Sequence, residues 1–250
     1  MHCIERAETP YQRIEVWKSA HQVEFRVQQA VHAWWHRQRF LTGLAWDNMI
    51  AACLLRPAGP PRSILMLGLA GGTTFRALRR LLPDVALTAV DIDGPCIDLA
   101  RRHMHLDDLQ CTIHIADAYQ WIHQCRKTYD VVIDDVYLAG SHDVYRPGSW
   151  NEKNLLDLKK LVAPGGLLLT NLIRGAGHRN LQSQIRKLFR EQFPSAKDVR
   201  TPCGLNETLC GGDAILGASA LQQWRELFSS SRDRDLWDII SIRKLPKLIT

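Results

Sequence analysis

Apolar and amphipathic segments alternate along the chain from residue 63 onward. Short apolar runs bounded by turn residues are typical of buried strands, and the segments between them carry apolar residues at helical spacing. We expect strands at residues 63–67, 86–91, 112–116, 130–135, 166–172 and 213–217. We expect helices at residues 73–82, 95–104, 118–126, 152–162 and 178–193. This alternation predicts an α/β fold with a doubly wound, mostly parallel, Rossmann-like sheet.

The first sixty residues have a different pattern, in which apolar and polar residues alternate as they do in half-buried strands. The alternation includes Ile14, Val16, Val23, Phe25 and Val27. Residues 56–61 contain three prolines and a glycine, which exclude a helix interior or a central strand and predict a stiff connector. The sequence therefore predicts a small N-terminal β appendage over residues 1–60 and a nucleotide-binding domain over residues 61–250.

A glycine-rich segment between two predicted strands gives the most specific signal. An apolar run ends in Gly68-Leu69-Ala70-Gly71-Gly72, a helical pattern follows, and the next apolar run ends in Asp91-Ile92-Asp93. Glycine lets a ligand approach the backbone, and Asp91 is placed to accept hydrogen bonds from ribose hydroxyls. The spacing G-x-x-G-G differs from the dinucleotide fingerprint, and a Walker lysine is absent. We therefore expect an adenosine derivative without a phosphate, such as S-adenosylmethionine or its decarboxylated form. A tight turn that binds no ligand is the alternative.

Four acidic residues are predicted to lie at the carboxyl ends of strands, where doubly wound sheets bind their ligands. They are Asp91, Asp117, Asp134 and Asp135. Because carboxylates are rarely buried without partners, this cluster predicts a cationic or hydroxyl-rich ligand. Asp117-Ala118 is suited to reading the adenine amino group or to capping a helix, and both roles are compatible. A hydrogen-bonded turn is the alternative for Asp134-Asp135.

Five motifs occur in the order found in spermidine synthases, and the chain resembles divergent members of this aminopropyltransferase family. They are Tyr11-Gln12, the glycine segment, Asp91-Ile92-Asp93, Ala116-Asp117-Ala118 and the run from Asp130 to Asp135. The resemblance implies a seven-stranded sheet of the methyltransferase type and a decarboxylated S-adenosylmethionine cofactor without a metal. Its implied cofactor residues are Gln12, Gly68, Gly71, Gly72, Asp91, Ile92, Asp117 and Ala118.

The resemblance also implies a catalytic role for Asp135, with Asp134 beside it. An alkyl amine has a pKa of roughly 10, as lysine does, so it must lose a proton before it attacks the carbon next to a sulfonium. Asp135 would attract and orient the ammonium and help to remove that proton. Gln12 and Asp91 would hold the ribose, and Asp117 the adenine.

Three polyamine contacts of the family differ in this chain. Gly71 occupies the place of an aspartate that binds the propylamine group, Leu138 that of a second loop acid, and Trp46-Asp47 that of Tyr-Gln or Tyr-His. We therefore expect the protein to alkylate a small amine-like acceptor, but not to be a strict spermidine synthase. Asp47 could replace one of the charges lost from the polyamine contacts. Methyl transfer from S-adenosylmethionine and nucleotide binding without catalysis are the alternatives. Met66 stands where many methyltransferases carry an acid for the methionine amine.

The segment from residue 136 to 150 predicts a substrate lid, because it holds more large polar and aromatic residues than a connector needs. Arg146 is one of them, and Gly140 and Gly148 are candidate hinges. The candidate acceptor-binding residues are Tyr137 and His142 from this segment and Trp46 and Asp47 from the appendage.

Composition excludes several other classes of protein. The chain has 250 residues, of which 46% are hydrophobic, and no apolar run approaches the ~20 residues of a membrane span. With no apolar signal region, a cytoplasmic location is expected. Seven cysteines without a C-x-x-C pair favour free thiols over disulfides, although Cys203 and Cys210 are close in sequence.

The remaining expectations concern partners. The net charge is +6, and residues 171–200 are locally basic, but apolar residues at helical spacing there indicate an amphipathic helix with a solvated basic face. We do not expect nucleic-acid binding. His32 and His36 have metal-ligand spacing only on a helix, and no metal is expected. Four of eight tryptophans lie in the appendage, which predicts an apolar contact surface and a homodimer.

Overall fold

The computed structural model describes residues 1–140, 144–147 and 151–245. Its centre is a mixed, mostly parallel sheet in the order β14–β12–β13–β11–β8–β5–β6–β7. The strands are β5 (Ser63–Leu67), β6 (Ala86–Asp91), β7 (Thr112–Ile115), β8 (Tyr129–Asp134), β11 (Val162–Ile173), β12 (Ser195–Arg200), β13 (Asn206–Gly212) and β14 (Ser241–Lys244). The first five pair in parallel, and the last three are antiparallel to their neighbours. The fold class is as predicted, with eight strands in the described sheet instead of seven.

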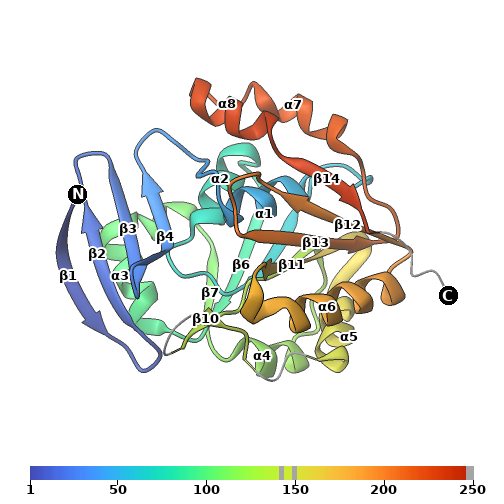
Figure 1. Cartoon of the computed structure of the whole chain (residues 1–250), viewed down its shortest axis with the longest axis horizontal. Coiled ribbons are helices and arrows are strands. Elements are labelled where there is room, and N and C mark those ends of the chain that lie inside the picture. The colour runs from blue at the N-terminus through green and yellow to red at the C-terminus, as the bar shows by residue number, and fades with distance from the viewer. Residues whose placement is uncertain (141–143, 148–150, 246–250) are drawn as a thin grey trace.

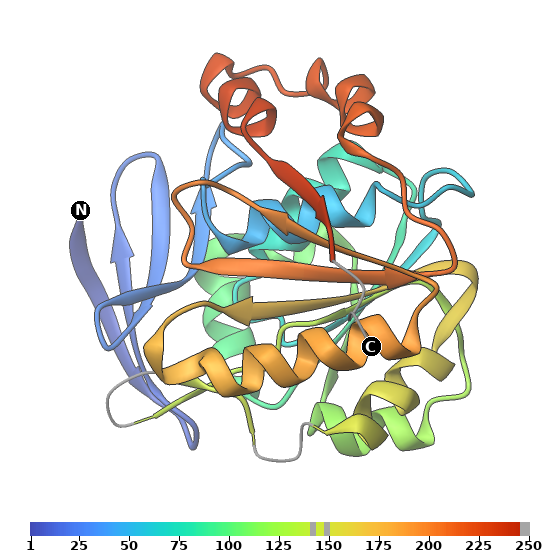
Figure 2. The ribbon, with the colours of Figure 1, turned by 45° about the vertical axis from the view of Figure 1, so that its right-hand side comes forward.

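Helices cover both faces of the central sheet. They are α1 (Ala45–Cys53), α2 (Thr73–Leu81), α3 (Gly94–Met104), α4 (Ala118–Gln124), α5 (Glu152–Lys160), α6 (Arg179–Gln192), α7 (Gln222–Arg225) and α8 (Ser231–Asp238). Figures 1 and 2 show α4, α5 and α6 together on one side of the sheet, and α7 and α8 on the other. Alternate residues of β5 enter two separate cores: Ile64 and Met66 pack with α1 to α3, and Leu65 and Leu67 with α4 to α6.

The N-terminal β appendage is a four-stranded antiparallel sheet beside the central one (Figure 1). Its strands are β1 (His2–Glu8), β2 (Arg13–Lys18), β3 (Gln22–Val27) and β4 (Ala30–His36). The predicted apolar positions on β2 and β3 are buried and join the first core. Helix α1, which the sequence pattern did not predict, follows β4 and packs against α2, β11, β12 and β13.

The antiparallel edge of the central sheet differs from the sequence prediction. The strand expected at 213–217 is wrong, because β13 ends at Gly212, while β12 and β14 were not expected. These strands carry charged residues that apolar patterning does not detect. Asp198 and Glu207 are buried there, and both pair with Arg186 and Arg200 at N···O distances of 2.5–3.3 Å. This pairing also accounts for part of the local basic charge.

Several chain-wide expectations can be compared with the structure. All seven cysteines are unpaired. No helix within the described ranges is both long enough and apolar enough to cross a membrane. His32 and His36 lie on strand β4 and therefore lack the helical spacing that a metal pair would need.

Candidate active site

A cavity of about 700 Å³ lies at the carboxyl ends of the parallel strands, a size typical of small-molecule sites. The apolar face of the N-terminal sheet forms its opposite wall, through Ile14, Phe25 and Val27. The cavity brings together nine of the residues predicted from sequence: Gln12, Trp46, Gly68, Asp91, Ile92, Asp117, Ala118, Asp135 and Tyr137. The cavity therefore lies at the carboxyl ends of the strands, where the sequence predicts a ligand site.

The glycine segment connects β5 to α2 and is shaped by close packing. Gly68 has φ +82°, and a Cβ there would collide with the carbonyl oxygen of Asp135. Only glycine fits where the ends of β5 and β8 come so close. Gly71 and Gly72 do not line the cavity: a Cβ on Gly71 would collide with Met104 and Ala33, and one on Gly72 with Leu106. Of the three glycines, Gly68 alone borders the cavity.

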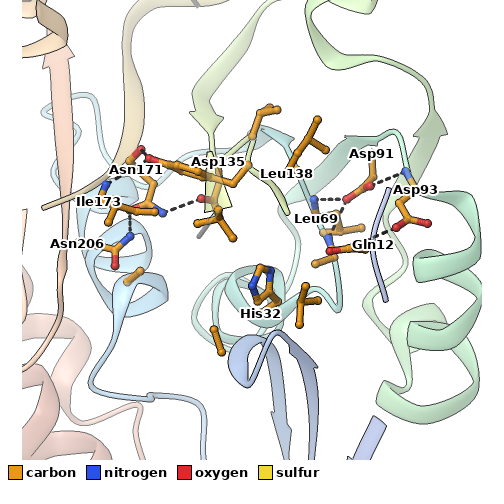
Figure 3. A pocket seen from close by; sticks show the side chains of 18 of the residues that line it. Gln12, His32, Leu69, Asp91, Asp93, Asp135, Leu138, Asn171, Ile173 and Asn206 are labelled. Atoms are coloured by element: carbon orange, nitrogen blue, oxygen red, sulfur yellow. Dashed lines mark hydrogen bonds between the residues drawn. The ribbon is translucent and has the colours of Figure 1, made fainter. Parts of the chain in front are cut away.

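Asp91 holds the glycine segment in place from the end of β6. Its Oδ2 accepts hydrogen bonds from the backbone N–H groups of Leu69 (2.8 Å) and Ala70 (2.9 Å), and Oδ1 accepts one from Asp93 (2.9 Å; Figure 3). Burial raises the pKa of Asp91, and these hydrogen bonds oppose the rise. Oδ1 accepts one hydrogen bond and can accept another, so these contacts are compatible with a ribose ligand.

Gln12 connects the N-terminal sheet to the side of the cavity that carries Asp91. Its Nε2 donates to Oδ2 of Asp93 at 2.9 Å, and Thr9 Oγ1 donates to the same oxygen at 2.8 Å. The other oxygen of Asp93 caps α3 by accepting from the N–H of Cys96. Gln12 therefore docks the β1–β2 hairpin onto α3 and also borders the cavity.

Asp117 begins α4 as a helix cap. Its Oδ1 accepts from the N–H groups of Tyr119 at 2.9 Å and Gln120 at 3.2 Å. The cap role is thus confirmed. Asp117, Ala118 and Ile92 also line the cavity, so the adenine role stays a prediction that the geometry allows.

Asp135 lies in the cavity wall directly after β8. Its Oδ1 accepts a 2.7 Å hydrogen bond from Nδ2 of Asn171, whose Oδ1 accepts one of 3.2 Å from Asn206 (Figure 3). Burial raises the pKa of Asp135 to about 7, against the opposing effects of Asn171 and the positive charge of Arg146. The protein thus holds here a carboxyl group that exchanges a proton near neutral pH. Asn171 falls near the end of the strand expected at residues 166–172, whereas Asn206 was not identified, because the last strand was expected at residues 213–217.

Asp134 points away from the cavity. Its carboxylate pairs with Arg146 at 2.7 Å, with both side chains fully buried, and accepts a hydrogen bond of 3.2 Å from Tyr119. Arg146 also donates to the backbone carbonyl of Asn171 and lies over the ring of Tyr137 at 4.7 Å. Arg146, predicted to be part of a lid, is instead a buried support for the strand ends that carry Asp135 and Asn171.

Tyr137 is fixed in the cavity wall by backbone contacts. Its hydroxyl donates to the carbonyl of Asn171 at 3.1 Å and accepts from the N–H of Ile173 at 3.3 Å. Of the predicted lid, β9 (Leu138–Ala139) and β10 (Val144–Tyr145) form a two-stranded sheet. His142 and the candidate hinge Gly148 lie outside the described residues.

A family model fits this architecture. The model named "Spermine/spermidine synthase domain" matches residues 44–203, which span the glycine segment, Asp91, Asp117, Asp135 and Asn171. This chain belongs to the spermine/spermidine synthase family.

Relatives of this family member include transferases of two kinds. A probable polyamine aminopropyl transferase of Bifidobacterium longum is 27% identical over 137 residues, 54% of this chain and 29% of that protein. An eEF1A lysine and N-terminal methyltransferase homolog of Drosophila melanogaster is 25% identical over 176 residues, 66% of this chain and 25% of that protein. The chain thus spans less than a third of either relative.

A solved structure extends the likeness to the whole fold. A probable spermidine synthase from Corynebacterium glutamicum superposes with a TM-score of 0.76 at 16% identity and covers 98% of this chain and 91% of its own. The N-terminal sheet and the central sheet together therefore form a spermidine-synthase-like fold.

The positions at which this family member departs from spermidine synthases differ in their surroundings. Leu138 and Trp46 line the cavity. Asp47 does not: its buried carboxylate accepts hydrogen bonds from the N–H groups of Thr42 and Gly43 at 2.6–3.1 Å. Burial raises the pKa of Asp47 to about 6. Asp47 shapes the loop before α1 and does not line the cavity. His32 of β4, which its spacing to His36 marks only as a candidate metal ligand, does line it (Figure 3).

Proposed function

We propose that this protein transfers an alkyl group, an aminopropyl group in the first instance, from decarboxylated S-adenosylmethionine to the nitrogen of a small amine. The observation that carries the proposal is Asp135, a cavity-wall carboxyl group with a pKa of about 7. It lies between the acids of the nucleotide side and the amides of Asn171 and Asn206 (Figure 3). Family membership supports the same reaction class.

The nucleotide side fits an adenosyl group by its chemistry. Gly68 leaves the backbone open to the ligand, while Asp91 and Asp117 offer acceptors for ribose hydroxyls and an adenine amino group. Apolar side chains of Leu69 and Ile92 border the same space. A sulfonium held here has an electrophilic carbon beside it and a neutral thioether as its leaving group.

Asp135 supports the acceptor chemistry in two steps. An ammonium that binds beside Asp135 stabilises the ionised carboxylate, which burial otherwise disfavours. The ammonium then gives up a proton to the Asp135 carboxylate, and the lone pair of the resulting neutral amine forms the new C–N bond while the C–S bond breaks and leaves methylthioadenosine. Holding the amine in line with that bond supplies most of the acceleration, and Asn171 fixes the carboxylate for this purpose.

Methyl transfer is the second candidate, and Gly71 favours it. The glycine packs against Met104 and Ala33 outside the cavity, so an aspartate that grips a propylamine has no equivalent there. The reaction would then leave S-adenosylhomocysteine. Nucleotide binding without catalysis is the third candidate and predicts neither product.

Calorimetric titration with S-adenosylmethionine, its decarboxylated form and methylthioadenosine, followed by turnover with a panel of amines, tests the proposal. Tighter binding of the decarboxylated form and release of methylthioadenosine, detected by mass spectrometry, is the expected result. Asp135→Asn should keep the binding and lose the turnover, and the exposed Asp84→Asn should change neither. Release of S-adenosylhomocysteine instead would establish methyl transfer, and binding of none of the three would overturn the nucleotide site.

A further inference from the structure

The two ends of the cavity differ in charge. Figure 3 has Asp91, Asp93 and Gln12 on one side of Asp135, and Asn171, Ile173 and Asn206 on the other. The nucleotide end carries three carboxylates, of Asp91, Asp93 and Asp117. The far end, from residue 171 to 178 and from 203 to 206, carries none among the described lining residues.

Arg174 is the one Arg or Lys among the described residues that line the cavity. Its Nη2 donates to the carbonyl of Gly204 at 2.7 Å, and its backbone N–H donates to the carbonyl of Leu205 at 2.7 Å. These contacts fix the side chain against the turn that precedes β13. The guanidinium is thus preorganised at the end of β11, on the far side of Asp135.

The charge of Arg174 is not matched by an acid. No carboxylate of the described residues lies within ion-pair distance of it, and its buried Nε has no hydrogen-bond partner there. Arg186 of α6 and Arg200 of β12, by contrast, each pair with both Asp198 and Glu207. An unmatched arginine beside a cavity is a common way of binding an anion, because its planar group pairs well with carboxylates and phosphates.

We propose that the far end of the cavity binds an anionic group of the acceptor through Arg174. The acceptor is then an amine with a carboxylate at its other end, such as a linear amino acid, and not a diamine. The inference rests on the proposed function, in which Asp135 receives the attacking amine. The second ammonium of a diamine would be repelled by the charge of Arg174 at the far end, where no acid is present among the described lining residues.

The test is a binding comparison on full-length protein saturated with methylthioadenosine, with acceptors of matched length. We would titrate 4-aminobutyrate against putrescine, 5-aminopentanoate against cadaverine, and phosphoethanolamine as a phosphate arm. An Arg–carboxylate hydrogen bond predicts that the carboxylate member of each pair binds at least about tenfold more tightly. Tighter binding of phosphoethanolamine than of either amino acid would contradict the carboxylate assignment.

Three variants separate recognition from folding. Arg174→Gln should weaken the binding of both amino acids about tenfold to a hundredfold and leave the affinity for methylthioadenosine unchanged. Arg174→Lys should restore part of the loss, and Arg174→Glu should reverse the preference toward the diamine. Arg179→Gln, an exposed arginine at the start of α6, is the control for net charge and should change nothing.

Each remaining outcome counts against the inference. Diamines that bind as tightly as amino acids, or binding of neither class, would overturn it, as would an Arg174→Gln variant whose main defect is in S-adenosylmethionine binding. The proposed function fails separately, when no nucleoside thioether is released with any amine. Turnover of diamines with unchanged rates in Arg174→Glu would overturn the inference and leave the proposed function intact.

Discussion

The two sides of β8 build the cavity in different ways. On the β5–β7 side, Asp91 and Asp117 accept hydrogen bonds from backbone N–H groups, so each acid holds a loop or helix end as well as facing the cavity. On the β11–β13 side, neutral amides and one arginine take their place. Asp135 lies between the two, and among the described residues its side chain has a single donor, the amide of Asn171. A carboxylate with several N–H donors stays ionised and is suited to binding a ligand, whereas a buried carboxylate with few donors has a raised pKa and is suited to proton transfer.

The sharpest test of this comparison is Asp135→Asn. The amide can keep the contact to Asn171 but cannot take a proton, so we expect the turnover rate to fall about 10²- to 10⁴-fold with nucleoside affinity little changed. Steady-state kinetics and calorimetry measure the two effects. A rate within a few-fold of the wild-type value would assign Asp135 to the same structural class as Asp91.

The neighbouring acid should respond to mutation in the opposite way. Arg146→Met leaves the fully buried Asp134 carboxylate without its cation, and such a loss costs about 3–5 kcal/mol of unfolding free energy. Urea denaturation measures it. The double variant Asp134→Asn/Arg146→Met should recover part of the stability, because no uncompensated charge remains. Equal stability of the two variants would mean that the arginine acts through packing on Tyr137 and not through charge.

The difference between the two sides of β8 also explains which parts of the structure could be predicted from the sequence. Central parallel strands are buried on both faces and read as apolar runs, so β5, β6 and β8 were located within one residue. Their ends carry Gly68, Asp91 and Asp135, whose residue types report directly on backbone geometry and charge. These cavity-lining residues on the β5–β8 side could therefore be predicted from the sequence.

The antiparallel side could not be predicted to the same extent. β12 and β13 bury Asp198 and Glu207, whose charges are paired by arginines from α6 and from β12 itself. No local pattern reveals this partnership. The orientation of single acids is equally hidden, since Asp134 and Asp47 look like site residues until Arg146 and the loop around Thr42 are seen to bind them.

The third prediction concerns pH. Since the pKa of Asp135 is raised to about 7, the ionised base is lost as pH falls, and kcat/KM should drop about tenfold per pH unit well below 7. The stability of the fold should change with pH in the opposite direction to the rate. Because the pKa of Asp135 is higher in the folded protein than in the unfolded chain, its contribution to stability is fully present below pH 3.8 and is lost as pH rises through about 7. The melting temperature of Asp135→Asn minus that of wild type should therefore increase from pH 4 to pH 8. A flat difference would contradict the burial of this charge.

The smallest expected effect separates docking from ligand binding at Gln12. Gln12 and Thr9 both donate to Asp93 Oδ2, so either alanine variant loses a contact between the hairpin and α3, and Gln12→Ala should cost about 1 kcal/mol of stability. Thr9→Ala should cost more, because Thr9 Oγ1 also accepts hydrogen bonds from the N–H groups of Tyr11 and Gln12. Only Gln12 of the two borders the cavity. If it also contacts ribose, Gln12→Ala should weaken methylthioadenosine binding about fivefold in calorimetry, whereas Thr9→Ala should leave it near the wild-type value. Equal affinities in the two variants would restrict Gln12 to docking, and the ribose would then depend on Asp91 with its backbone-bound oxygens.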